Sequence, residues 1–381
     1  MNLNQMKTVP FYVKIACTLF SLIALCYIVI IGKEILEPLI FSCLFSILLL
    51  PLASFLEKRL KLPRSAASML SVLILLASIG LVMYVIGSQI SNLSDDWPQF
   101  QEQLTKSINT LQNWVAVTFH VNADKQLTYV KSATTKMMAS GTTVIGATLL
   151  SLSSLLLFFV FTFIYTFFFL LYRKLIMKFL ESVFLDDNKA LVHEIIKQVQ
   201  YIIRKYIVGL LIEMAIVAAA VCIVFWMLGV KYAILLGLIT GLFNVIPYIG
   251  IFTALIISSL VTFATATAAS KVLLVIITLV IVHLIDSNIL LPIVVGSKVR
   301  INALITVLGV IIGEMIWGIP GMFLSIPVIA VLKIIFDRIE SMQPWGIILG
   351  DEDHKQNKLA TRLKVTKENR PEIPAKDTSV T

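Results

Sequence analysis

Charged residues are scarce in this sequence of 381 residues: only 14% are Asp, Glu, Lys or Arg, whereas 58% are hydrophobic. Soluble domains carry about 25% charged and about 45 to 50% apolar residues, so the composition argues against an ordinary soluble enzyme. Acidic residues are also outnumbered, 22 against 31 basic ones, which gives a formal net charge of +9. In so apolar a chain, basic residues mark the ends of membrane spans and give no reason to expect nucleic acid. The composition predicts a membrane protein.

Cysteine and catalytic motifs are scarce as well. The four cysteines, Cys17, Cys26, Cys43 and Cys222, lie inside apolar runs without the spacing of a metal site or a disulfide framework, and we interpret them as small hydrophobic residues. The sequence has no His-Glu-x-x-His, Gly-x-Ser-x-Gly or Cys-x-x-Cys motif, and Gly296-Ser297-Lys298 lacks the upstream glycine of a phosphate-binding loop. We therefore expect neither an enzyme nor a cofactor, and any transport must use a gradient or a partner.

Long apolar runs fill most of the chain instead. A hydrocarbon core about 30 Å thick needs about 20 helical residues to cross it, which selects residues 11–31, 36–55, 66–90 and 147–172 in the first half. The first run is too long for the core of a signal peptide and is followed at once by a second span. The joint at residues 57–64 is short and carries four basic residues, so we expect it, and the N-terminus, to be cytoplasmic.

Two polar segments separate these spans from the second half. Residues 91–146 show an amphipathic helical pattern and nearly balanced charge, which predicts a small extracytoplasmic helical domain. Its apolar faces pack on one another or on other subunits, so we expect a homo-oligomer; a ligand-capture lid is the alternative. Residues 173–205 carry seven basic and four acidic residues on an amphipathic pattern. They predict a helix along the cytoplasmic interface, with a coupling element between the halves as the alternative.

Two later apolar segments are interrupted by proline and glycine. Residues 231–263 are broken at Asn244-Val245-Ile246-Pro247-Tyr248-Ile249-Gly250, and residues 301–336 at Trp317-Gly318-Ile319-Pro320-Gly321. Proline lacks an N–H and clashes with the preceding turn, so each helix must stop and restart. The arms of the first segment, about 21 Å long, are too short to span, which predicts a re-entrant hairpin from the outside. The second either dips from the cytoplasm or crosses. Two broken helices that enter the membrane from opposite faces are typical of secondary transporters, which build their binding site at the midplane from such helices.

The predicted fold is therefore an all-α polytopic membrane protein with about eight transmembrane or re-entrant helical segments. Its divisions are three spans in 1–90, the extracytoplasmic domain in 91–146, a fourth span in 147–172, the cytoplasmic helix in 173–205, a transmembrane core in 206–340 and a disordered cytoplasmic tail in 341–381. Both termini are expected in the cytoplasm, in a multi-pass protein of the cell membrane.

Three acids lie in apolar segments: Glu213, Asp286 and Glu314. A charged side chain in a membrane costs at least about 2.5 kcal/mol, so each needs a partner, a cavity or a proton. Asp286 follows His283 by three residues on one helical face, which indicates either a proton-relay or cation site or a structural hydrogen bond. Glu314 either accepts a proton or caps a half-helix. Glu213 we interpret mainly as a partner of Arg204 or Lys205 at the interface.

The breaks supply further candidates for a substrate path. Asn244 and Tyr248 either contact a polar, sugar-like ligand or merely cap and pack the broken helix. Asn288, close to Asp286, is a third polar candidate on this path. The remaining candidates shape the backbone rather than bind: Pro247, Gly250, Gly318, Pro320 and Gly321.

These motifs, with Asp286-Ser287-Asn288, Pro292, Gly296, Gly313-Glu314 and Pro327, resemble the AI-2E family, also called the autoinducer-2 exporter or PerM-like permease family. The resemblance reaches from the first span to about Arg338 and implies a secondary transporter. It departs from the family where Asp286-Ser287-Asn288 replaces a Glu-Gly-Asn type sequence, which implies a less bent helix. Asn302-Ala303 also replaces a His-Pro pair, which puts any role of that pair in doubt.

The expected function is export of a small polar solute such as autoinducer-2 through the lipid bilayer, with proton coupling through Asp286. A sodium/proton antiporter is the alternative within the same class, with Na⁺ in place of the solute. A scaffold that does not transport is the alternative from another class. It would act through residues 91–146 and the cytoplasmic helix.

Overall fold

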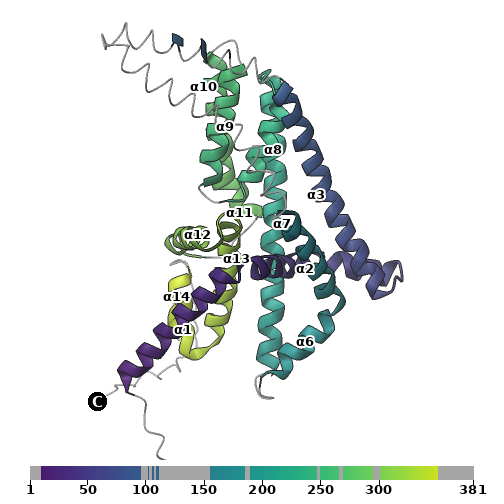
Figure 1. The fold of residues 1–381 in the computed structure, drawn as a ribbon, viewed down its shortest axis with the longest axis vertical. Helices are drawn as coiled ribbons and strands as arrows, with labels where there is room; N and C mark the ends of the chain where they lie inside the picture. The colour runs from purple at the N-terminus through teal and green to yellow at the C-terminus, as the bar shows by residue number, and fades with distance from the viewer. Residues whose placement is uncertain are drawn as a thin grey trace, which may run out of the picture.

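The computed structural model describes residues 10–95, 102, 105–106, 109–110, 155–184, 189–246, 249–265, 269–294 and 301–350. Every regular element within these residues is a helix, so the predicted all-α class is confirmed (Figure 1). Six of the described helices are long and apolar enough to cross a membrane, and a bent pair raises the number to seven. The expected domain at 91–146 and the tail beyond residue 350 lie almost wholly outside the described residues.

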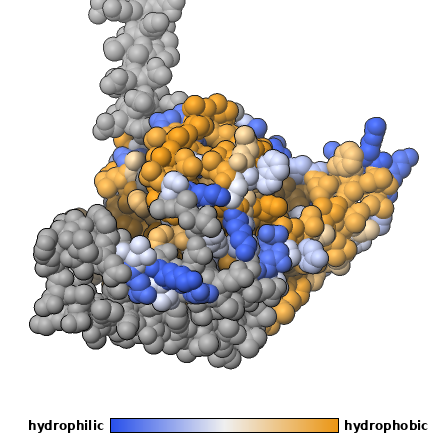
Figure 2. Space-filling view, turned by 90° about the horizontal axis from the view of Figure 1, so that it is seen from above, coloured by the Kyte–Doolittle hydropathy of each residue, from blue (hydrophilic) through white to orange (hydrophobic). Residues whose placement is uncertain are grey.

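The first three spans are present as α1 (Phe11–Ile31), α2 (Lys33–Arg59) and α3 (Arg64–Asp95). Helix α3 runs five residues past the expected boundary at residue 90, because its sequence has no Pro or Gly there to end it. Helix α1 buries none of its residues and extends away from the body of the molecule (Figure 1). Large hydrophobic side chains are exposed along the described helices, as is typical of a surface that contacts membrane. Seen from above, the described surface is largely hydrophobic with hydrophilic patches between (Figure 2).

The fourth span is described from residue 155 and ends at a sharp elbow. Its helix, Leu155–Leu171, meets α6 (Arg173–Ser182) at an angle of 72°. Phe158 contributes an edge-on ring contact, 5.5 Å between centroids, to Phe41 of α2, and Phe41 also stacks on Phe323 of α13. The Arg173 guanidinium at the elbow donates to Glu57 at the end of α2, 2.6 Å away. These contacts attach the fourth span to the remainder of the protein.

Helix α7 (Lys189–Met227) is the central element and runs through the middle of the molecule (Figure 1). Its 39 residues form one continuous helix, so the expected boundary at residues 205/206 is absent. Nothing in Ile203-Arg204-Lys205-Tyr206 can end a helix, and the amphipathic half simply continues into the span. At 1.5 Å per residue α7 is about 58 Å long, about twice the hydrocarbon thickness.

The first break is present where the sequence places it. Helix α8 (Ala233–Phe243) stops at a turn over Asn244–Ile246, and α9 (Ile249–Thr265) begins beyond it. The chain returns through α10 (Ala269–Ile285), a π-helical turn η2 (Asp286–Leu290) and the short α11 (Leu291–Val294). Helices α7, α8, α9 and α10 share one apolar core, centred on Phe225, Leu236 and Val275, all fully buried.

The second break is also present, between α12 (Ala303–Trp317) and α13 (Ile319–Arg338). Ile246 of the first break packs against Val310 of α12 and Met322 of α13, so the two broken segments meet inside the molecule. A short 3-10 turn η3 (Glu340–Met342) and a last helix, α14 (Gln343–Leu349), follow α13.

Helix α14 contradicts the expected start of the disordered tail at residue 341. Asn302 donates its backbone N–H to the carbonyl of Leu349, 3.1 Å away, and Ile301 forms an isolated bridge with Gly350. Gly346 packs so closely on Asp337 of α13 that a side chain there would overlap it. These contacts hold 343–349 in a helix despite its polar flanks.

Candidate functional site

Asn244 joins two buried acids in the centre of the molecule. Its Nδ2 donates to Oε1 of Glu213, 3.1 Å away, and to Oδ2 of Asp286, 3.0 Å away. Because these two oxygens lie 3.1 and 3.0 Å from the same nitrogen, the two carboxyl groups are neighbours. Glu213 is 3% exposed and Asp286 is 5% exposed, so neither is solvated by bulk water. Three residues from three separate helical segments therefore form one cluster, which we call the acid–amide cluster.

Local helix geometry puts each member in place. Glu213 follows Tyr206 and Leu210 at helical spacing along the buried face of α7. Asn244 is the C-cap of α8, where the first break begins. Asp286 opens the π-helical turn η2, and its position there is the kind of irregularity that often accompanies function.

Charge in the cluster is not balanced by a neighbouring cation. Oε2 of Glu213 and Oδ1 of Asp286 are buried and accept no hydrogen bond from the described residues. The described residues that line the adjoining cavity include no Lys or Arg. An uncompensated buried carboxylate is costly, and two in contact repel each other. The cluster therefore needs a proton or another cation.

A cavity of about 500 Å³ opens beside the cluster. Its wall is mostly aliphatic, with several polar side chains among the lining residues. The residues that line it are Tyr206, Leu210, Glu213, Asn244, Val245, Ile246, Ile251, His283, Asp286, Ser287, Leu291, Pro292, Ile301, Ala303, Thr306 and Ile326. They come from α7, from both sides of the first break, from α10 to α11, and from α12 and α13. A pocket of this size and lining fits a small molecule that is fixed by a few polar contacts.

His283 and Ser287 form a second polar pair on this wall. Their Nε2 and Oγ atoms lie 3.4 Å apart, one helical turn from each other. Nδ1 of His283 is buried without a hydrogen-bond partner among the described residues. His283 lies on the cavity together with Asp286, as its helical spacing predicts, although no hydrogen bond links the two side chains in the described structure.

Close backbone contacts explain the glycines of both breaks. A side chain on Gly250 would overlap the carbonyl of Phe243, so the two arms of the first break touch through backbone. A side chain on Gly313 or on Gly321 would overlap the carbonyl oxygen of the other, and α12 and α13 cross there. Gly318 has φ 68° and ψ −140°, and Pro320 lies in the first turn of α13. None of these residues is among the described residues that line the cavity.

Other predicted residues lie elsewhere. Glu314 is exposed on α12, and its backbone carbonyl accepts the N–H of Gly318. Asn288 is exposed and donates to the carbonyl of Leu284, one turn back. Pro247 and Tyr248 lie outside the described residues. The preferred interpretation of Glu213, an ion pair at the interface, is wrong, because its carboxyl group faces Asn244 instead.

Sequence reasoning also missed part of the site. Tyr206 and Thr306 line the cavity and carry hydroxyl groups, and neither stood out in an apolar run. For Tyr206 a signal existed, since it lies seven residues before Glu213 and hence on the same face of a helix. For Thr306 none existed, because its place depends on how α12 packs against the first break.

The family model for AI-2E family transporters matches residues 19–341, which include every residue of the acid–amide cluster. The chain belongs to the AI-2E transporter family. It is therefore a multi-pass membrane protein of a family of transporters and permeases, whose partners are a small solute and the lipid bilayer.

Individual relatives of this AI-2E family transporter span most of its length. The "Putative transport protein YrrI" of Bacillus subtilis (strain 168) is 29% identical over 313 residues, which cover 79% of this chain and 86% of that protein. The "AI-2 transport protein TqsA" of Escherichia coli (strain K12) is 26% identical over 332 residues, which cover 84% of this chain and 90% of that protein. The match to "Putative permease PerM" of Escherichia coli (strain K12) is shorter, 25% over 149 residues.

Proposed function

We propose that this AI-2E family transporter exports a small polar solute across the cytoplasmic membrane by secondary transport, with the solute bound in the cavity beside the acid–amide cluster. The observation that carries the proposal is that both broken segments line this one cavity, Val245 and Ile246 from the first and Thr306 and Ile326 from the second. Broken helices that meet at a polar site are the means by which secondary transporters alternate access.

Autoinducer-2 is the solute that we propose to test first. The relative from Escherichia coli is named as a transporter of it and aligns with 84% of this chain. Autoinducer-2 is a small polar molecule. The cavity offers it hydrogen-bonding groups: the amide of Asn244, the hydroxyl groups of Tyr206 and Thr306, and the imidazole of His283.

Proton coupling through Asp286 is the second part of the proposal. A buried acid on the wall of a solute cavity is placed to link its own charge to the solute. We infer the orientation from the basic joint at residues 57–64, which supports a cytoplasmic location of both termini. Export then draws on protons that move inward.

The test is flux of autoinducer-2 in proteoliposomes of known orientation under an imposed proton gradient. We expect the wild type to move solute and Asp286→Asn to lose the component that depends on the gradient. Glu314→Gln is the matched control, because Glu314 is also an acid of the second half but is exposed and outside the cavity. It should retain the wild-type flux.

Two results would contradict parts of the proposal. Equal gradient dependence in wild type and Asp286→Asn would show that Asp286 does not couple protons. A gradient of Na⁺ that collapses a pH gradient without any solute would favour the antiporter. If a broad set of small solutes gave no flux at all, the proposed transport would be wrong for this chain.

A further inference from the structure

We propose that Glu213 and Asp286 hold one proton between them, and that Asn244 transmits the charge of this pair to the first break. The proposal deepens the proposed function, because it names the proton site and gives it two acids in place of one. Its first part concerns proton binding alone and stands whether or not a solute is transported.

The case for one shared proton is geometric. Both acids are more than nine-tenths buried, and one oxygen of each lies within 3.1 Å of the same amide nitrogen. A carboxylate only accepts hydrogen bonds, so these two neighbouring carboxyl groups can bond to each other only if one of them is protonated. Two charges here would repel each other, and one proton removes this repulsion. One proton satisfies the pair.

A proton suits the site better than a metal ion. Among the described residues no group of three His, Cys, Asp or Glu side chains is arranged to hold a metal. The remaining oxygens, Oε2 of Glu213 and Oδ1 of Asp286, are buried beyond contact with water, so a hydrated cation cannot reach them. Ca²⁺ takes six to eight oxygen ligands and Mg²⁺ takes six, far more than the pair offers.

The residues around Glu213 and Asp286 leave these two acids as the main acceptor of a proton on the cavity wall. Helix α7 contributes Tyr206 beside Glu213, and the segment from α10 into η2 contributes His283 and Ser287 beside Asp286. Helix α12 contributes the uncharged Thr306, and α13 contributes the aliphatic Ile326. Within the described lining, His283 and Tyr206 are thus the only other ionisable side chains, and Nε2 of His283 lies 3.4 Å from Oγ of Ser287.

Asn244 links the charge of the two acids to the packing of the first break. Its amide carries two hydrogens, one for each acid, and this arrangement requires the two acids to stay close. When the proton leaves, repulsion separates the acids and the amide cannot reach both. Asn244 ends α8, and Ile246, two residues on, packs against α12 and α13. Loss of the proton therefore loosens the wall where the two breaks meet.

Infrared spectroscopy of the protein in lipid nanodiscs, without solute or gradient, tests the proton site. The signal is the C=O stretch of a buried protonated carboxyl group, assigned as the band that the double variant Glu213→Gln/Asp286→Asn lacks. We expect the band in the wild type at neutral pH. In each single variant we expect the band to disappear at lower pH than in the wild type, because the remaining acid is still buried but no longer faces a like charge. Glu314→Gln should retain it.

Three outcomes would overturn the shared proton: no such band in the wild type, a band that disappears at the wild-type pH in Glu213→Gln but at lower pH in Asp286→Asn, or its loss in Glu314→Gln. Because no transport is measured, a failure here is distinct from a failure of the proposed function.

The role of Asn244 is tested in the same preparation. In Asn244→Ala the acids lose their common donor, so we expect the protonated band to persist to higher pH than in the wild type, with loss of any flux driven by the proton gradient. Asn288→Ala, which removes an amide bonded only within its own helix, is the control. A band that disappears at lower pH in Asn244→Ala, or equal effects of the two variants, would overturn the role of Asn244.

Discussion

Gly318 holds the second break in a backbone conformation that side chains resist. Its φ of 68° and ψ of −140° lie where almost only glycine is found. Its N–H still bonds to Glu314 and its carbonyl to Met322, so the residue joins α12 to α13 without a loop. The fold here depends on one residue type at one position.

Replacement of Gly318 should therefore destabilise the protein through the backbone alone. No atom lies within 4 Å of a methyl group added at Gly318, so Gly318→Ala adds no collision. We expect a loss of about 1–3 kcal/mol, measured as a lower midpoint of thermal unfolding in detergent. Gly80→Ala is the matched control, because Gly80 lies in α3 with equally open space, and it should be neutral or stabilising by up to about 1 kcal/mol. Equal midpoints for the two variants would contradict the account.

At the residue scale, the sequence singled out each residue of the acid–amide cluster but did not show that the three lie together. Asp286, Asn244 and Glu213 each stood out as polar residues in apolar runs. Their meeting did not follow, because Asn244 is 31 residues from Glu213 and 42 from Asp286, and tertiary packing alone decides which pairs touch. The positions Arg204 and Lys205, close in sequence to Glu213, therefore suggested the wrong partner.

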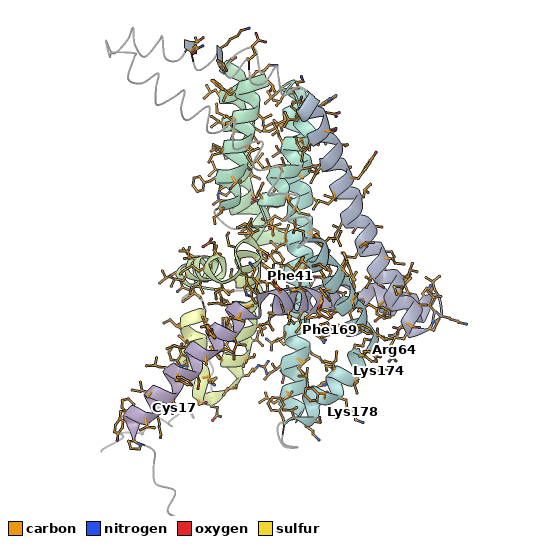
Figure 3. The ribbon with its side chains drawn as sticks, in the orientation of Figure 1. Cys17, Phe41, Arg64, Phe169, Lys174 and Lys178 are labelled. Atoms are coloured by element: carbon orange, nitrogen blue, oxygen red, sulfur yellow. The ribbon has the colours of Figure 1, made fainter. Side chains whose placement is uncertain are left out.

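Among the helices, α6 has the features of an element that lies in the membrane interface. It leaves the fourth span at 72°, and its exposed face alternates two lysines with two large apolar residues, Lys174, Leu175, Lys178 and Phe179. Figure 3 shows Lys174 and Lys178 on α6 and Arg64 at the start of α3 at the same end of the molecule. Such a face inserts its apolar residues among lipid chains while its lysines reach phosphate groups.

A depth measurement tests this placement of α6. A nitroxide on Phe179→Cys should lie near the headgroups, with intermediate accessibility to both oxygen and a water-soluble nickel reagent. A nitroxide on Val160→Cys, exposed within the fourth span, should be accessible to oxygen alone. Both are placed in a variant without the four native cysteines. If the nickel reagent reached Phe179→Cys as freely as it reaches a soluble loop, α6 would not lie in the interface.

The sequence predicted the boundaries of helices correctly where a proline or glycine forces the helix to end. Proline and glycine placed both breaks correctly, because each removes helical bonds or permits a turn that other residues avoid. The start of α7 and the existence of α14 did not follow. In α7 a polar amphipathic stretch and an apolar span have no breaker between them, and α14 depends on contacts with residues 301–302 and 337.

For the whole molecule, composition and span length were enough to predict a polytopic helical membrane protein. The cavity was beyond sequence reasoning, because its wall is drawn from six helices that span residues 206–326. The two broken segments meet beside that wall, where Ile246 packs against Val310 and Met322. The account therefore depends on one claim above the others, that the solute passes through this cavity.

Chemical blockage of the cavity tests that claim most directly. In a variant without native cysteines, Thr306→Cys places a thiol on the cavity wall, and Leu308→Cys places one on the exposed face of the same helix. Both are reacted with a bulky thiol reagent in proteoliposomes, and flux of autoinducer-2 is measured before and after. The account predicts loss of flux for Thr306→Cys and unchanged flux for Leu308→Cys. Full flux through fully modified Thr306→Cys would contradict it.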